Sequence, residues 1–158
     1  MYRRILVPVD GSAVSTLGLR HANELAKSQR ARLRVLNVVD ARLVVPALGG
    51  YSEPDVKAIL SRMSAAGRNA VEDAVLLASK SRVRPETAIV EGRDRLVSEV
   101  IVGDAKRWRA DLIVMGTHGR RGLNRLLMGS DAERVLSAAQ VPVLLVRHGK
   151  AKPHSGKE

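Results

Sequence analysis

Five short apolar segments dominate the pattern of hydrophobic and polar positions along the chain. They are rich in β-branched residues, and most of them are nearly continuous rather than alternating. Continuous apolar runs of this length are typical of strands that are buried on both faces, as in a parallel sheet. The pattern therefore predicts strands at residues 5–9, 33–39, 87–90, 112–115 and 141–146.

Segments with a helical period lie between the predicted strands. Ser12 stands at an N-cap position for the first helix, and an apolar helical stripe runs from Pro54 to about Lys80. Asp94 and Ser130 are expected to cap a third and a fourth helix. The order β-α-β-α-β-α-β-α-β predicts an α/β fold in which one parallel sheet carries helices on both faces.

Length and local composition predict one domain, residues 1–147, followed by a basic disordered tail, residues 148–158. The chain has 158 residues, which is the usual size of a single domain. Gly, Lys, Pro, His and Ser dominate the tail, and chain ends of this composition are commonly disordered. Residues 41–53, which include Pro46 and Gly49, are expected to form a long loop.

The net charge of +11 points to anionic ligands, which include nucleotides, nucleic acids and acidic surfaces. The chain has two Tyr, one Trp and no Phe, and this scarcity of stacking platforms argues against nucleic acid. No apolar run approaches the roughly 20 residues that a membrane span needs, so no membrane partner is expected. The chain starts directly on a strand-like segment rather than on a secretory signal, which predicts a cytoplasmic protein.

The segment from Gly116 to Ser130 carries the strongest local signal for a binding site. Its glycines follow the pattern G-x2-G-x9-G-S, which begins where a predicted strand ends and finishes where a predicted helix starts. Glycine lets a backbone approach a ligand closely, and a helix N-terminus attracts anions. Positive charge within the segment comes from Arg120, Arg121 and Arg125. We interpret the segment as a phosphate-binding loop; the alternative is that its glycines only make turns and that Ser130 and Glu133 form a capping box.

A second candidate site, Pro8-Val9-Asp10, follows the first predicted strand. A carboxylate at that place can accept hydrogen bonds from a ribose, a base amine or a metal-bound water. The alternative is that Asp10 only organises the turn into the first helix. Ligands of open α/β sheets bind outside the carboxyl ends of the strands, so Asp10 and Gly116 would meet in one crevice if the first and fourth strands were neighbours.

These features together resemble the universal stress protein family. The opening, Ile5-Leu6-Val7-Pro8-Val9-Asp10-Gly11-Ser12, is similar to the first strand and turn of that family. The segment from Gly116 to Ser130 matches its phosphate motif, and Val141-Pro142-Val143-Leu144-Leu145-Val146 resembles its last strand. The resemblance covers roughly residues 2 to 147. It implies a five-stranded parallel sheet in the order 3-2-1-4-5, a Rossmann-like fold of the adenine nucleotide alpha-hydrolase type.

The same resemblance implies an ATP site and a dimer. The adenine and ribose would lie near Pro8, Asp10 and Val38. The phosphates would lie on Gly116, Gly119, Gly129 and Ser130, and the same site would be lined by Val9, Met115, His118, Arg120 and Asp131. The family usually forms homodimers through its last strand, which here runs from Val141 to Val146 and would otherwise be an exposed apolar edge.

Asp131 stands where nucleotide-binding members often carry valine. An aspartate in the first turn favours the helix dipole, but it also brings a negative charge close to a γ-phosphate. A magnesium ion could bridge the two, held through bound water by Asp131 or Asp10. Without magnesium, the repulsion would favour ADP or AMP over ATP.

The residues and the resemblance predict a cytoplasmic ATP-binding stress protein that acts as a nucleotide-dependent regulator or protector. No general base or phosphate-loop lysine is evident, so at most slow ATP hydrolysis is expected. Three alternatives stay open. The first is an interaction module of the same fold that binds no nucleotide and docks an acidic protein partner on its basic surface. The second is nucleic-acid binding through that surface, and the third is an enzyme such as a phosphotransferase or adenylyl transferase, which fold alone does not license.

Overall fold

Strands and helices alternate along the chain as the sequence predicts. The computed structural model describes residues 1–43, 52–92, 94–117 and 128–147. The elements in chain order are β1 (Arg4–Pro8), α1 (Ala13–Gln29), β2 (Arg32–Val39), a 3₁₀ turn η1 (Ala41–Leu43), α2 (Glu53–Lys80), β3 (Glu86–Glu91), α3 (Val97–Trp108), β4 (Leu112–Gly116), α4 (Ser130–Ala138) and β5 (Val143–Val146).

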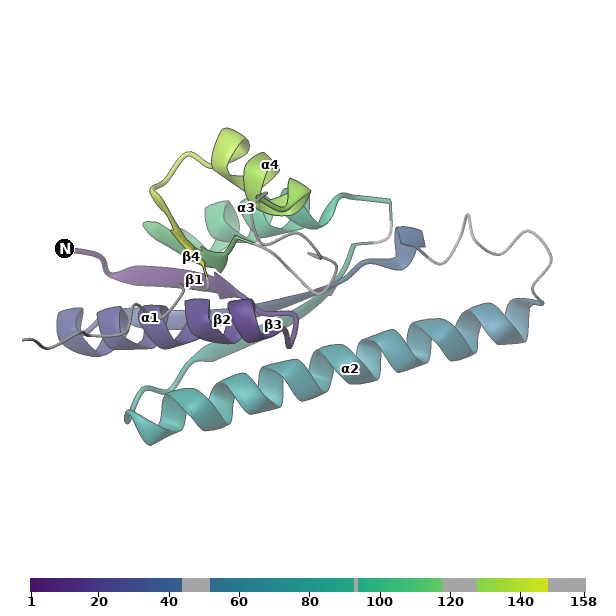
Figure 1. Ribbon diagram of the computed structural model, residues 1–158, viewed down its shortest axis with the longest axis horizontal. Coiled ribbons are helices and arrows are strands. Elements are labelled where there is room, and N and C mark those ends of the chain that lie inside the picture. Colours follow the sequence, from purple (N-terminus) through teal and green to yellow (C-terminus); the bar gives the residue numbers. More distant parts are fainter. Residues whose placement is uncertain (44–51, 93, 118–127, 148–158) are drawn as a thin grey trace, which may run out of the picture.

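The five strands form one parallel sheet in the order β3-β2-β1-β4-β5, which confirms the predicted order. β1 pairs with β2 on one side and with β4 on the other. The first and fourth strands are therefore neighbours, which is the condition that the crevice hypothesis required. Helices α1 and α2 cover one face of the sheet, and α3 and α4 cover the other (Figure 1).

Burial on both faces explains why the strands are continuous apolar runs. Ile5 and Val7 pack with α1 and α2 in one hydrophobic cluster, whereas Leu6 packs with α3 and α4 in the other. All three side chains are fully buried. Successive side chains of a strand point to opposite faces, so a strand covered on both sides, such as β1, is apolar at successive positions.

The start of α3 differs from the prediction. The helix begins at Val97 with Leu96 as its N-cap, rather than with a cap at Asp94. The backbone N–H of Leu96 donates to Oε2 of Glu99 at 2.8 Å. The first-turn glutamate stabilises this helix start from inside the helix, so no capping side chain is needed before it.

The start of α4 also differs, whereas the start of α1 is as predicted. Ser130 is the first residue of α4 and Gly129 is its N-cap, so the predicted cap at Ser130 is wrong, and the Ser130–Glu133 capping box of the alternative interpretation is not formed. The backbone N–H of Glu133 donates instead to the carbonyl of Gly129. Ser12 does cap α1: its Oγ accepts a hydrogen bond from the backbone N–H of Ser15 at 3.2 Å.

The last strand is shorter than predicted. β5 begins at Val143 rather than at Val141. Pro142 has no N–H to donate to a neighbouring strand, although its carbonyl accepts one from Ile113. The predicted tail, residues 148–158, lies outside the described residues, as do residues 44–51 of the predicted loop. Among the helices described, none is long and apolar enough to cross a membrane.

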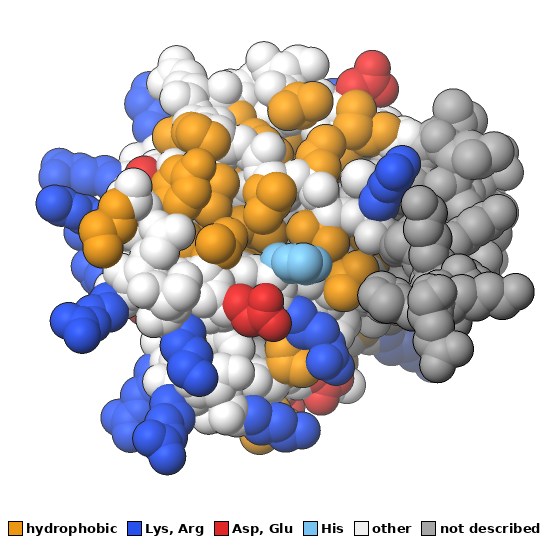
Figure 2. Space-filling view, turned by 60° about the vertical axis from the view of Figure 1, so that its left-hand side comes forward, with side chains coloured by type: hydrophobic (Ala, Val, Ile, Leu, Met, Phe, Trp, Pro, Cys, Tyr) orange, Lys and Arg blue, Asp and Glu red, His pale blue; other side chains and the backbone are white. Residues whose placement is uncertain are grey.

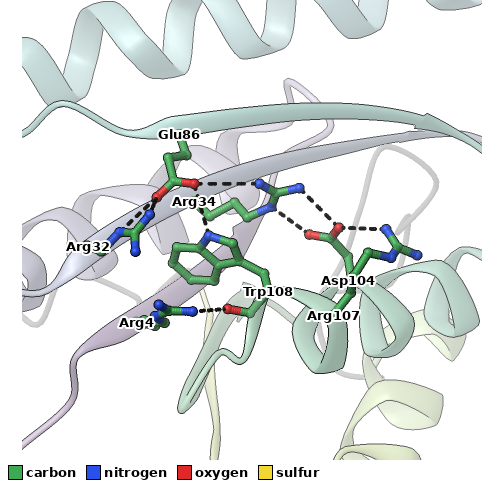
Figure 3. Close-up of polar contacts among 7 residues, drawn as sticks. All are labelled: Arg4, Arg32, Arg34, Glu86, Asp104, Arg107 and Trp108. Atoms are coloured by element: carbon green, nitrogen blue, oxygen red, sulfur yellow. Dashed lines mark hydrogen bonds and ion pairs between the residues drawn. The ribbon is translucent and has the colours of Figure 1, made fainter.

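An arginine–tryptophan cluster lies where the strands begin (Figure 3). Its members are Arg4, Arg32, Arg34, Glu86, Asp104, Arg107 and Trp108. The indole Nε1 of Trp108 donates to Glu86 at 3.0 Å, and the guanidinium of Arg32 donates to the other carboxylate oxygen of Glu86. Arg34 donates to both oxygens of Asp104, at 2.8 and 3.2 Å. The cluster ties the first residues of β1, β2 and β3 to the end of α3.

Glu86 makes the stability of the protein depend on acid. Burial alone raises the pKa of Glu86, but hydrogen bonds from Trp108 and Arg32 and the charges of Arg32 and Arg34 outweigh burial and hold this pKa below its ordinary value of 4.5. Ionised Glu86 therefore stabilises the fold above about pH 4.5, and this contribution is lost as the pH falls through the folded-state pKa. We expect Glu86→Gln to lower the Tm at about pH 7, with a gap to the wild type that narrows as the pH falls below about 4.5. Thermal unfolding followed by circular dichroism across this range measures the gap, and an equal gap at both ends would contradict the assignment.

Candidate functional site

A cavity of about 380 Å³ opens at the carboxyl ends of the strands. Its walls come from the ends of β1, β2 and β4, the first half of α2, and the starts of α3 and α4. The strand order reverses between β1 and β4, and open α/β sheets bind ligands at such a point. The volume lies within the range of about 300–1,000 Å³ that is usual for small-molecule sites.

Every predicted site residue that the structure describes lines this cavity. These residues are Pro8, Val9, Asp10, Val38, Met115, Gly116, Gly129, Ser130 and Asp131. The other predicted site residues, His118, Gly119 and Arg120, lie outside the described residues. Asp10 and Gly116 are more than a hundred positions apart in the sequence, yet the pairing of β1 with β4 brings them to one cavity.

Asp10 organises the turn between β1 and α1. Its Oδ1 accepts a hydrogen bond from the backbone N–H of Ser12 at 2.9 Å. Gly11, between them, has a φ of +80°, which side-chain-bearing residues rarely adopt. The structural interpretation of Asp10 is therefore correct. The same residue also borders the cavity, so the turn fixes a carboxylate at the cavity wall.

Thr117 and Gly129 hold the two ends of the glycine-rich segment together. The backbone N–H of Gly129 donates to the carbonyl of Thr117 at 2.8 Å, and the N–H of Thr117 donates to the carbonyl of Val146 at 2.8 Å. The two ends of the segment are therefore held next to each other, beside the start of α4. The N-cap of α4 is Gly129, which has no side chain of its own to cap the first turn, and such a helix start attracts anions.

The charged residues on the described cavity wall are acidic. They are Asp10, Asp40 and Asp131. Asp40 is 8% exposed, and both of its oxygens accept hydrogen bonds from Arg42. Asp131 is more exposed and lies 4.0 Å from Arg134. The described residues hold no cluster of three or more His, Asp or Glu that could bind a metal ion by itself.

The sequence analysis did not predict that α2 and the polar residues at the end of β2 line the cavity. Asn37 is 5% exposed, and its Nδ2 donates to the carbonyl of Val9 at 2.8 Å. Its Oδ1 faces Gly67 of α2 and has no hydrogen-bond partner among the described residues. A polar residue inside an apolar run was the available signal for Asn37. Asp40 follows a strand just as Asp10 does, which was the available signal for Asp40.

The parallel sheet, its strand order and the crevice at the strand ends define a Rossmann-like α/β protein of the adenine nucleotide alpha-hydrolase type. A sequence model of the Universal stress protein family matches residues 1–147. The chain belongs to the universal stress protein family.

Three relatives illustrate the match. A universal stress protein of Methanocaldococcus jannaschii is 37% identical over 150 residues, which cover 95% of this chain and 85% of that protein. The crystal structure of a family member from Burkholderia pseudomallei is 32% identical, with a TM-score of 0.75 over 93% of this chain and 97% of that one. A universal stress protein from Archaeoglobus fulgidus in complex with dAMP shares the fold, with 24% identity and a TM-score of 0.65 over 92% and 98%.

Proposed function

We propose that this chain is an ATP-binding universal stress protein and that the cavity at the carboxyl ends of β1, β2 and β4 is its nucleotide site. One observation carries the proposal: Asp10, Gly116 and the uncapped start of α4 meet at one cavity at the point where the strand order reverses. The relative from Archaeoglobus fulgidus, which was solved with dAMP, supports an adenine nucleotide as the class of ligand.

The residues would divide into a nucleoside part and a phosphate part. Pro8, Val9 and Val38 would contact the adenine, and Asp10 would accept a hydrogen bond from the ribose. The phosphates would lie on the glycine-rich segment and the first turn of α4, through Gly116, Gly119, Gly129 and Ser130. Met115, His118, Arg120 and Asp131 would complete the site. The hydrogen bond between the backbones of Thr117 and Gly129 supports this division, because it places both ends of the glycine-rich segment beside the cavity.

Because acidic side chains line the cavity, we propose that ATP binds there together with magnesium. Asp10 and Asp131 both border the cavity, and like charges repel a triphosphate. A magnesium ion bound to the phosphates would offset the repulsion, with Asp10 or Asp131 holding its water ligands. Because the described residues offer no complete metal site, the ion would bind together with the nucleotide rather than before it.

Isothermal titration with ATP, in the presence and absence of magnesium, tests the site. We expect removal of magnesium to weaken ATP binding about tenfold, which corresponds to about 1.4 kcal/mol. Asp131→Val should reduce this dependence, because it removes the charge next to the terminal phosphate.

Gly119→Val is the variant that tests the loop itself. It should abolish ATP binding while the circular dichroism spectrum stays that of the wild type. If the wild type gives no heat and no thermal shift at millimolar ATP, the protein is instead an interaction module that binds no nucleotide. Mass spectrometry of any nucleotide released on denaturation identifies what the protein carries after purification.

We further propose a cytoplasmic homodimer that acts as a nucleotide-dependent regulator or protector and hydrolyses ATP slowly at most. Among the strands that the structure describes, β5 pairs with β4 alone and is therefore an edge of the sheet. Leu144 on this strand is 39% exposed, and unpaired edge strands with apolar side chains favour pairing with a second chain. These observations support β5 as the dimer contact.

A further inference from the structure

Exposed arginines and lysines concentrate at the end of the molecule opposite to the cavity. In this parallel sheet the strands begin at that side, and helices α1, α2, α3 and α4 end there. Figure 2 brings this side forward and shows more Lys and Arg than Asp and Glu side chains on it. We define the basic end by its exposed cations: Arg3, Lys27, Arg30, Arg32, Lys80, Arg82, Arg84, Lys106, Arg107 and Arg109.

Three carboxylates at the same end, Glu86, Asp104 and Asp111, are engaged in hydrogen bonds. Glu86 binds Arg32 and Trp108, and the buried Asp104 binds Arg34 and Arg107. Asp111 accepts hydrogen bonds from the backbone N–H groups of Arg3 and Arg4. The surface charge of the basic end is therefore strongly positive.

Helix dipoles do not account for this amount of charge. The C-terminus of a helix carries roughly half a negative charge, so the four helices together present about two. About two cations would neutralise them. The basic end carries a large surplus beyond that number.

Three arginines of the basic end hold a backbone conformation that glycine would adopt at lower cost. Arg30, Arg82 and Arg109 each follow a helix, and their φ angles are +53°, +61° and +56°. Helices commonly end with glycine in this left-handed conformation, which costs other residues roughly 1–2 kcal/mol. At three separate connections the chain therefore carries a guanidinium where glycine would be more stable. Arginine at these three positions is explained if its positive charge binds a partner at this surface.

The sheet arranges part of the positive charge in a row. Arg84 precedes β3, Arg32 begins β2, Arg4 begins β1 and Arg109 precedes β4, in the spatial order of the strands. Neighbouring strands lie about 4.8 Å apart, so the row spans roughly 15 Å. The arginine–tryptophan cluster fixes its centre, because Arg4, Arg32 and Arg34 lie 5.8, 5.9 and 5.8 Å from the centre of the Trp108 ring (Figure 3). Side chains held in place lose less entropy when they bind a ligand.

We propose that the basic end is a docking surface for an acidic protein segment, a stretch of chain rich in Asp and Glu. Guanidinium groups pair with carboxylates through two parallel hydrogen bonds, and a row of them matches an extended acidic segment. Nucleic acid fits less well. Trp108 is only 8% exposed and cannot stack on a base, and the helices present their C-terminal ends, so no described element projects to enter a groove. This surface lies away from the nucleotide cavity and does not depend on it.

A labelled peptide of alternating Glu and Ser, titrated with the full chain and followed by fluorescence anisotropy, tests the proposal. We expect binding at about 20 mM salt that weakens at least about tenfold at about 200 mM, because salt screens exposed charges. The variant Arg82→Asn, Arg84→Gln and Arg109→Asn should bind at least about tenfold more weakly than the wild type. Asparagine suits the left-handed positions, so this variant should keep the wild-type Tm.

A charge-matched control separates location from net charge. Arg20→Gln, Arg62→Gln and Arg68→Gln remove the same charge from exposed positions on α1 and α2, and this control should lose less than about twofold in affinity. An equal loss in both variants, or no binding by the wild type at low salt, would overturn the proposal. So would tighter binding of a DNA oligonucleotide of equal charge that is lost in the same basic-end variant, because the partner would then be nucleic acid. ATP titration of the basic-end variant should be unchanged, which keeps this result separate from the nucleotide site.

Discussion

Arg34→Met should lower the free energy of unfolding by about 3 kcal/mol, because it leaves a buried carboxylate without its main partner. Asp104 is 1% exposed, and Arg34 donates to both of its oxygens. Of the described residues, Arg107 alone would still bind Asp104, at 3.2 Å, from a side chain that is 64% exposed. Removing one partner of a buried ion pair is costly because the remaining charge stays buried without its partner, whatever the intact pair contributes to the free energy of unfolding.

Arg32→Met is the matched control for this prediction. Arg32 lies on the same strand, belongs to the same cluster and binds Glu86, but its side chain is 57% exposed. Exposed ion pairs contribute under about 1 kcal/mol, so the control should cost far less. The double variant Arg34→Met with Asp104→Leu should recover much of the loss, because both charges then leave the interior. Urea unfolding measures all three, and equal losses for the two single variants would show that burial of Asp104 does not control the effect.

The fold could be predicted because the central strands keep their apolar residues together. Leu6 and Val7 pack on opposite faces, so burial on both sides leaves a continuous run that is visible without any neighbour. The starts of the helices were predicted less accurately than the strands. At α3 the stabilising contact comes from Glu99 inside the helix, and the backbone of Leu96 receives it. Nothing in a leucine marks a cap, whereas Asp94 has the side chain of one, so local composition favoured the wrong residue.

The candidate site could be predicted where it lies at strand ends. Asp10 and Gly116 follow strands directly, and parallel strands end on one side of the sheet. The contribution of α2 could not be predicted in the same way, because the period of a helix shows which face is buried but not what it contacts. Asp104 illustrates the same limit, because its partner Arg34 is 70 residues away. Spacing along the chain carries no signal for such a pair.

Gly67→Ala is expected to destabilise the protein by about 1–3 kcal/mol, although alanine forms helices better than glycine does. A Cβ on Gly67 would lie 2.3 Å from Oδ1 of Asn37 and 3.1 Å from its Cγ. Asn37 is buried and cannot move aside freely, because its Nδ2 donates to the carbonyl of Val9 at 2.8 Å. The added methyl therefore has to break this hydrogen bond or push α2 away from the sheet. Either change would also reshape the cavity, because all three residues line it.

Gly103→Ala provides the comparison that isolates this contact. Gly103 also lies inside a helix, α3, but a Cβ there would meet nothing within 4 Å. The same substitution should therefore stabilise the protein by about 1 kcal/mol, so the two variants should change stability in opposite directions. In a chain that already carries Asn37→Ala, Gly67→Ala should lose its penalty, because the amide that obstructs the methyl is gone. A penalty that persists in the double variant would mean that α2 is held against the sheet by contacts other than the one between Gly67 and Asn37.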